Sequence, residues 1–119
     1  MGLDLYIKKK RKGEAYESSN WEEVAYTRNG WTVRQIILDN ISTYDEDTYT
    51  AKLTIGTLNE IIVKLAEALK EFNFNDYIDS LEYYRIANFL GQLASNLATD
   101  IVDMEEDNIF YEYRLIDSY

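Results

Sequence analysis

The sequence predicts an α+β fold. We expect one domain, residues 1–119, in which a small sheet of about three strands packs against two or three helices, in the order strand, helix, strand, helix, helix, strand. Two observations lead to this prediction. Apolar residues recur at helical spacing over residues 57–72 and over 77–104. Residues 2–9 and 48–55 instead alternate between apolar and polar side chains, as half-buried strands do.

Residues 57–72 give the clearest helical signal. Thr57 and Glu60 have the spacing of a capping box, which predicts that the helix begins at Thr57. One face is apolar throughout, so Leu65, at its middle, should be buried in the core. The residues of that face are Leu58, Ile61, Ile62, Leu65, Ala68, Leu69 and Phe72.

Residues 19–41 allow two interpretations. Capping-box spacing at Ser19–Glu22 and apolar residues at helical intervals favour a helix that is bent or broken at Asn29–Gly30. Asn-Gly is also the strongest short signal for a hairpin turn. The alternative is therefore a hairpin of two strands, residues 24–28 and 31–37.

The second half of the chain predicts a long helix and a closing strand. Asn75 or Asp76 should cap a helix over residues 77–104, antiparallel to the helix before it. Residues 100–107 are strongly acidic, and carboxylates are unfavourable at a helix C-terminus, so we expect fraying there. Residues 108–116 (NIFYEYRLI) should form the third strand.

The composition argues against several functional classes. The chain has neither Cys nor His, which removes thiol chemistry and the commonest general base and metal ligand. We therefore expect a protein that is not an enzyme and uses no cofactor. No apolar run approaches the length of a membrane span, and without Cys a reducing compartment is favoured. The expectation is a cytoplasmic protein without membrane contact.

Charge points to the kind of partner. The net charge is −10, but residues 8–12 carry +5, so the other 114 residues hold 7 positive and 22 negative side chains, a charge of −15. Such a body repels nucleic acid and favours a partner with a basic surface. The candidate contacts are the acidic groups Asp45, Glu46 and Asp47, and Asp100, Asp103, Glu105, Glu106 and Asp107. Tyr, of which there are 11, is enriched at protein interfaces.

The sequence offers two other candidate sites, one for a metal ion and one for a small ligand. Asp103, Glu105 and Asp107 have the spacing of the first ligands of a calcium loop. Asn108 replaces the required Gly and Arg114 replaces the bidentate Glu, so no metal is expected. The alternative hypothesis is a protein that binds a small ligand or nucleotide in a pocket, or an enzyme that uses such a pocket. Its candidate residues are Tyr26, Arg28, Trp31 and Arg34.

The opening MGLDLYI resembles a group of small phage and prophage proteins that begin Met-Gly-Leu-Asp-Met-Tyr-Leu. In that group a helix with an Ala-Tyr-Trp-Arg-Lys-Ala-Asn-x-Ile-His stretch follows, and Ala25, Tyr26 and Arg28 fit it, whereas Trp31 and Arg34 replace its Asn and His. Phe110, Tyr111 and Tyr113 suit the group's closing aromatic strand. The resemblance implies a phage setting. Our first hypothesis is thus a binding protein that blocks a host defence protein, similar to anti-CRISPR proteins in size and acidity, by occupying a cationic nucleic-acid channel.

Overall fold

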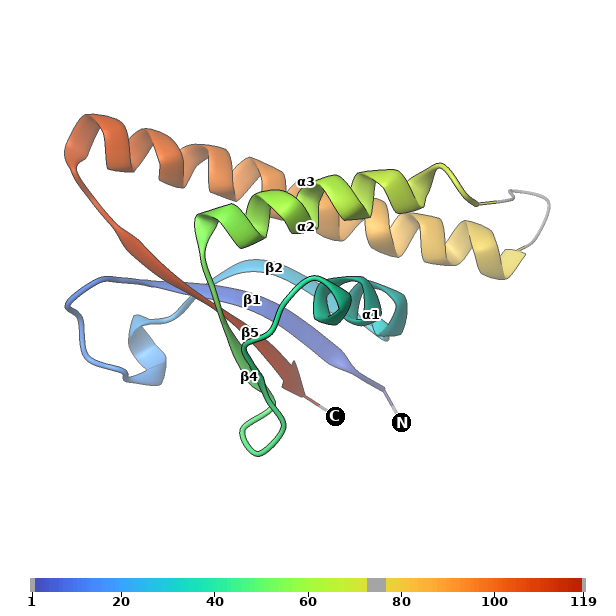
Figure 1. Ribbon diagram of the computed structural model, residues 1–119, viewed down its shortest axis with the longest axis horizontal. Coiled ribbons are helices and arrows are strands. Elements are labelled where there is room, and N and C mark those ends of the chain that lie inside the picture. The colour runs from blue at the N-terminus through green and yellow to red at the C-terminus, as the bar shows by residue number, and fades with distance from the viewer. Residues whose placement is uncertain (1, 73–76, 119) are drawn as a thin grey trace.

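The computed structural model describes residues 2–72 and 77–118, with residues 77–79 described by their backbone only. Five antiparallel strands form a sheet in the order β2-β1-β5-β4-β3. Three α-helices and one 3₁₀ turn complete the described fold (Figure 1). The strands are β1 (Asp4–Arg11), β2 (Glu22–Arg28), β3 (Tyr44–Asp45), β4 (Thr50–Leu53) and β5 (Tyr111–Ser118). The helices are α1 (Trp31–Asp39), α2 (Ile55–Leu69) and α3 (Tyr77–Asp107), and the 3₁₀ turn is Ser18–Asn20.

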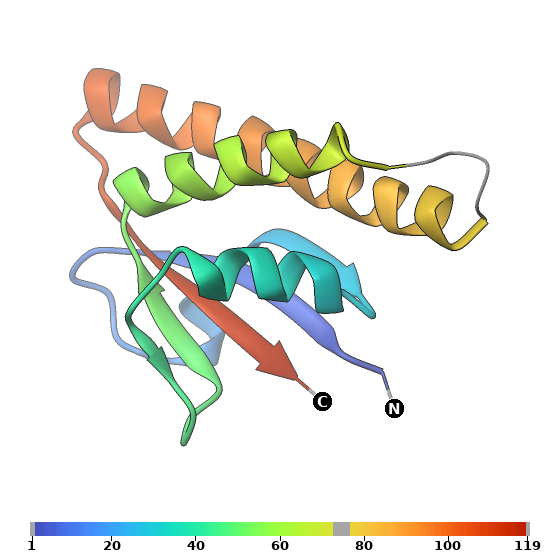
Figure 2. The ribbon, with the colours of Figure 1, turned by 45° about the vertical axis from the view of Figure 1, so that its right-hand side comes forward.

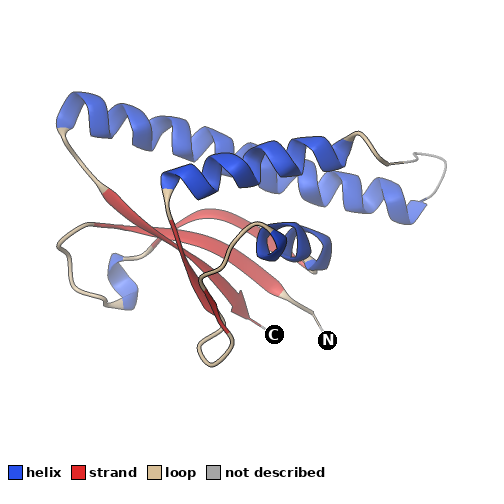
Figure 3. Ribbon diagram, viewed as in Figure 1, coloured by secondary structure: helices blue, strands red, loops and turns tan. Residues whose placement is uncertain are grey.

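The three α-helices cover one face of the sheet. In Figure 3 they lie on one side of the strands, and the turned view in Figure 2 places α1 beside α2 on that same side. Helix α3 packs against both β2 and α2, and α1 contacts both long helices. Alternate residues of each strand point into this layer because side chains alternate across a sheet. The opposite face of the sheet is left open by the helices.

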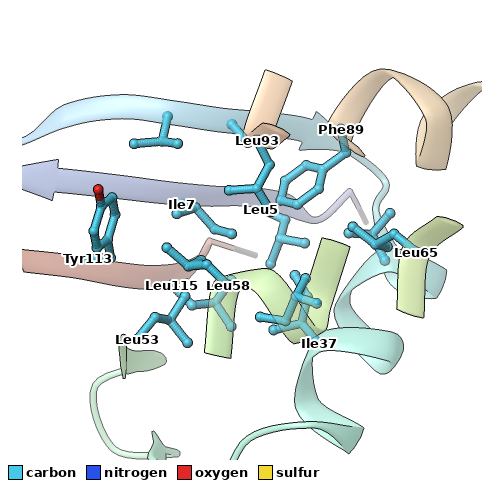
Figure 4. Close-up of a cluster of buried hydrophobic side chains, with 14 of the residues drawn as sticks. Leu5, Ile7, Ile37, Leu53, Leu58, Leu65, Phe89, Leu93, Tyr113 and Leu115 are labelled. Atoms are coloured by element: carbon cyan, nitrogen blue, oxygen red, sulfur yellow. The ribbon is translucent and has the colours of Figure 1, made fainter. Parts of the chain in front are cut away.

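The core lies between the helices and the sheet. Leu5, Ile7 and Leu115 from the central strands meet Leu58 and Phe89 from the helices (Figure 4). Leu65 is fully buried there, as predicted.

The α+β class is confirmed, but the sheet has five strands rather than about three. The prediction missed β3, which is two residues long and pairs with β4 through Tyr44 and Asp45. It also missed β2. The predicted strand over 48–55 is shorter, because Tyr49 lies in the turn between β3 and β4 with φ of 55°.

The favoured interpretation of residues 19–41 as a bent helix was wrong for its first half. Residues 22–28 form β2, which pairs antiparallel with β1 and buries Val24 and Ala25. Each interpretation held for one half, since Trp31–Asp39 is helical. Ser19 lies in the 3₁₀ turn, and no side chain caps that turn. Pairing with a central strand outweighed the local helix signals, which are weak compared with tertiary contacts.

The chain passes directly from β2 into α1 at Gly30, where there is no room for a Cβ, and this gives a testable prediction. A Cβ at Gly30 would lie 2.4 Å from Cγ2 of Thr27, a buried residue of β2. We expect Gly30→Ala to lower the free energy of unfolding by about 1–3 kcal/mol through overpacking. Gly91→Ala is the matched control, because Gly91 is an exposed residue of α3 and nothing lies within 4 Å of the position that its Cβ would take. Gly91→Ala should raise the free energy of unfolding by up to about 1 kcal/mol, because Ala is more favourable than Gly in a helix interior. Urea unfolding measures both, and a stabilised Gly30→Ala protein would contradict this account.

The start of α2 differs from the predicted capping box. Thr54 is the N-cap, and its hydroxyl accepts a hydrogen bond from the Thr57 amide at 3.1 Å. Thr57 is therefore the third helical residue, and Gly56 lies in the first turn of the helix. The helix uses the earlier of two Thr residues three positions apart, because β4 ends at Leu53.

Helix α3 does not fray where the sequence predicts. It continues to Asp107 and stops where Asn108 adopts φ of 56°. The expected cap at Asn75 or Asp76 lies outside the described residues. In the part of the chain that the structure describes, no helix is long and apolar enough to cross a membrane.

Candidate functional site

The acidic end of α3 is held by residues of the sheet. Asp100 is fully buried and pairs with Lys9 of β1, while Tyr113 of β5 donates a hydrogen bond to its other oxygen at 2.9 Å. One turn further on, Tyr111 donates to Asp103 at 3.0 Å. Burial and the bond to Asp100 raise the pKa of Tyr113. These contacts offset the unfavourable carboxylates and explain why the helix persists.

Two cations of the basic run, residues 8–12, form ion pairs inside the fold. Lys9 neutralises Asp100, and its ammonium also lies 4.4 Å from the centre of the Tyr111 ring. Lys10 is only 2% exposed and lies 3.2 Å from Glu112. Tyr16 covers Lys10, with its ring centre 4.2 Å from the ammonium, and donates to Glu112 at 2.7 Å. That hydrogen bond holds the pKa of Glu112 below its usual value. Two of the five charges, those of Lys9 and Lys10, are thus paired within the fold.

The predicted acidic contacts form two separate groups. We name the hairpin group Asp45, Glu46 and Asp47, at the end of β3 and in the turn that follows it, and the helix-end group Glu105, Glu106 and Asp107; all six are exposed. Asp100 is a correction, because its carboxylate is buried and paired. Asp103 is half-buried and bound by Tyr111. In Figure 1 the two groups lie at opposite ends of the β4–β5 strand pair. Among the described residues, no cluster of acidic side chains could hold a metal ion.

The predicted ligand-binding set is not assembled into one pocket. Arg34 of α1 binds the buried Asp117 at 2.8 Å, and Tyr44 donates to the same oxygen at 2.6 Å. Arg34 is therefore structural, which corrects its candidacy. Trp31 is exposed on α1. Tyr26 and Arg28 of β2 line a shallow depression of about 330 Å³ together with residues of α3, and neither Trp31 nor Arg34 borders it.

The Tyr44 hydroxyl predicts a change in stability at high pH. Burial and its bond to Asp117 raise the pKa of Tyr44 to about 12 from 10.0. A raised pKa means that the unfolded chain loses this proton first, so its contribution is complete below about pH 10 and is lost between about pH 10 and 12. We expect the free energy of unfolding to fall less steeply across that window in Tyr44→Phe than in the parent. Urea unfolding at pH 9 to 11.5 measures this, and parallel curves would contradict it.

Sequence reasoning missed a row of cations on the open face of the sheet. Lys8 of β1, Arg114 of β5 and Lys52 of β4 are cross-strand neighbours, since Lys8 and Lys52 both pair with Arg114. The signal was present in the alternation of each strand, but it required the strand order, which places residues far apart in the sequence side by side.

A cavity of about 400 Å³ adjoins this row where β4 ends and β5 begins. Two of the row's cations, Lys52 and Arg114, line it, together with Lys12 and the aromatic residues Tyr16, Trp21 and Phe110. Comparisons of this chain with protein-family models, with curated proteins and with solved structures found no match.

Proposed function

We propose that this protein is a binding protein whose acidic groups dock on a basic surface of a partner protein. The observation that supports it is the separation of charge in the fold. Lys9 and Lys10 are paired with Asp100 and Glu112, whereas the hairpin group and the helix-end group are exposed. Exposed carboxylates speed association with a cationic surface by long-range attraction.

The spacing of the two acidic groups indicates the size of the partner surface. The Asp117 amide donates to the carbonyl of Tyr49, so the hairpin segment lies beside the end of β5. The helix-end group lies just before the other end of that strand. At about 3.4 Å per residue, the roughly seven residues between Phe110 and Asp117 span about 24 Å. A nucleic-acid strand spaces its phosphates by about 3.4 Å along a duplex axis, so this span equals about seven nucleotides.

In its most specific form, the proposal is that the partner is a host defence protein with a cationic nucleic-acid channel. The two acidic groups would occupy positions that the channel reserves for phosphates, and the protein would act as an anti-CRISPR-like inhibitor in the host cytoplasm. Support for the phage setting comes from the resemblance of residues 1–7 to small phage proteins. Support for the channel comes from the size and acidity that this chain shares with anti-CRISPR proteins.

Affinity capture with matched baits tests the proposal. One variant neutralises both acidic groups with Asn or Gln. The control variant neutralises the same number of exposed acids elsewhere: Glu14, Glu17, Asp39, Glu60, Glu67 and Glu71. Both variants have the same net charge, so they differ only in where the charge is lost. We expect the parent and the control to capture the same basic protein from a bacterial lysate, and the test variant to lose it.

The salt dependence of association completes this test. For the captured protein, the association rate of the parent should fall steeply between about 50 and 500 mM salt, because the screening length shortens to a few Å. The test variant should associate more slowly and show a weaker dependence on salt. Equal rates and equal salt slopes for the two variants would contradict docking through the acidic groups.

A further inference from the structure

The cation row on the open sheet face is unfavourable on its own. Like charges directly opposite each other on neighbouring strands destabilise a sheet, yet Arg114 lies between Lys8 and Lys52 in one register across three strands. On its other side Lys8 pairs with Glu23 of β2. No carboxylate forms an ion pair with Arg114 within the described ranges 2–72 and 77–118. Its guanidinium lies 5.1 Å from the centre of the Trp21 ring and 5.7 Å from that of Tyr16. The aromatic rings hold this cation in place but do not neutralise it.

The cavity beside the row is positive even though it contains an acid. Glu112 lines it, but its carboxylate already receives Lys10 at 3.2 Å and the Tyr16 hydroxyl at 2.7 Å. Within the lining, the three cations Lys12, Lys52 and Arg114 therefore outnumber the single acid. This excess of positive charge stands out in a protein with a net charge of −10, because most of its surface attracts cations.

The walls of the cavity are apolar and aromatic. Tyr16 and Trp21, from the segment between β1 and β2, form one side, and Phe110 and Tyr111, at the start of β5, belong to the same lining. The volume of about 400 Å³ falls within the range of about 300–1,000 Å³ that is usual for small-molecule sites. Flat aromatic faces favour a flat partner ring, and Arg binds phosphate with two parallel hydrogen bonds.

We propose that this cavity binds a free mononucleotide, with its phosphate at Arg114 and Lys52 and its base among Tyr16, Trp21 and Phe110. The same chemistry would accept a nucleotide within a strand. The charge of the whole molecule favours the free form, because a polyanion would pass other, acidic parts of the surface, whereas a single phosphate meets only the cation row. The lining of this cavity contains no residue of either acidic group. Asp45 of the hairpin group borders a neighbouring depression together with Lys52 and Arg114.

Trp21 provides a direct probe of the cavity. The chain has two Trp residues, so Trp31→Phe leaves Trp21 as the single reporter. We would titrate this variant with adenosine 5′-monophosphate, with adenosine, and with a single-stranded oligonucleotide, and follow Trp fluorescence. The mononucleotide should quench Trp21 saturably, and adenosine should bind at least about tenfold more weakly, because a hydrogen-bonded charge contributes this much or more.

Charge variants in the same background identify the site. Arg114→Gln and Lys52→Gln should each weaken mononucleotide binding by about tenfold or more. Lys70 is an exposed cation beyond the end of α2, so Lys70→Gln removes the same charge elsewhere. This variant should change the affinity for the mononucleotide by less than about twofold. Lys52 is exposed, so its variant tests the site even where Arg114→Gln disturbs the sheet. Absence of saturable quenching, equal binding of adenosine, equal losses in Lys70→Gln, or binding of the oligonucleotide alone would each overturn the proposal.

Discussion

Replacing Asp100 by Asn should lower the free energy of unfolding by about 3–5 kcal/mol, because removal of one partner leaves the other charge of a buried pair uncompensated. Asp100 is fully buried, and the side chain of Lys9 is only 13% exposed. Asn keeps the size of the side chain and an oxygen that accepts from Tyr113, so the loss reports chiefly on charge. Urea unfolding monitored by circular dichroism measures it.

Two further variants separate charge from packing. Combining Asp100→Asn with Lys9→Met removes both charges and should recover a large part of the lost stability, because a neutral buried pair costs far less than an unpaired ion. Glu106→Gln, at an exposed position of the same helix, should change stability by no more than about 0.5 kcal/mol. Equal losses for Asp100→Asn and Glu106→Gln would show that the end of α3 is not held by this pair.

Truncating Leu65 to Ala should lower the free energy of unfolding by about 2–5 kcal/mol, the range for a buried Leu that leaves a cavity. Leu65 is fully buried within the core cluster that joins α2 to the sheet and to α3. Val63→Ala is the control on the same helix, since Val63 is 53% exposed. Its effect should stay within about 0.5 kcal/mol.

This comparison also tests the orientation of α2. An unfolding midpoint for Leu65→Ala that matches the parent, together with a large loss for Val63→Ala, would mean that the other face of α2 covers the sheet.

Periodicity predicted the parts of the fold that bury a continuous apolar face. The face of α2 around Leu65 and the alternation of β1 at Leu5 and Ile7 were both visible in the sequence. Strand β2 appeared only in the alternative interpretation, because its burial depends on pairing with β1 and its local pattern also fits a helix. The extent of α3 depended on Lys9, which is separated from Asp100 by 91 positions. Contacts of that kind cannot be found from local patterns.

The candidate site shows the same limit. The sequence indicates which residues are charged, and the hairpin group and the helix-end group are exposed, as such residues usually are. It does not indicate that Asp100 and Arg34 each bind an oppositely charged residue inside the fold. Nor does it place Lys8, Arg114 and Lys52 in one row, because that arrangement follows from the strand order.

The central claim is that a cationic partner docks at the hairpin and helix-end groups. Titrating the isotope-labelled protein with a short oligolysine peptide, and following its backbone amides by NMR, tests it most directly. We predict shift changes concentrated at residues 45–47 and 105–107, absent at Lys8, and lost as salt rises to about 500 mM. Changes centred on the exposed acids of α2, or spread evenly over the acidic surface, would contradict the claim.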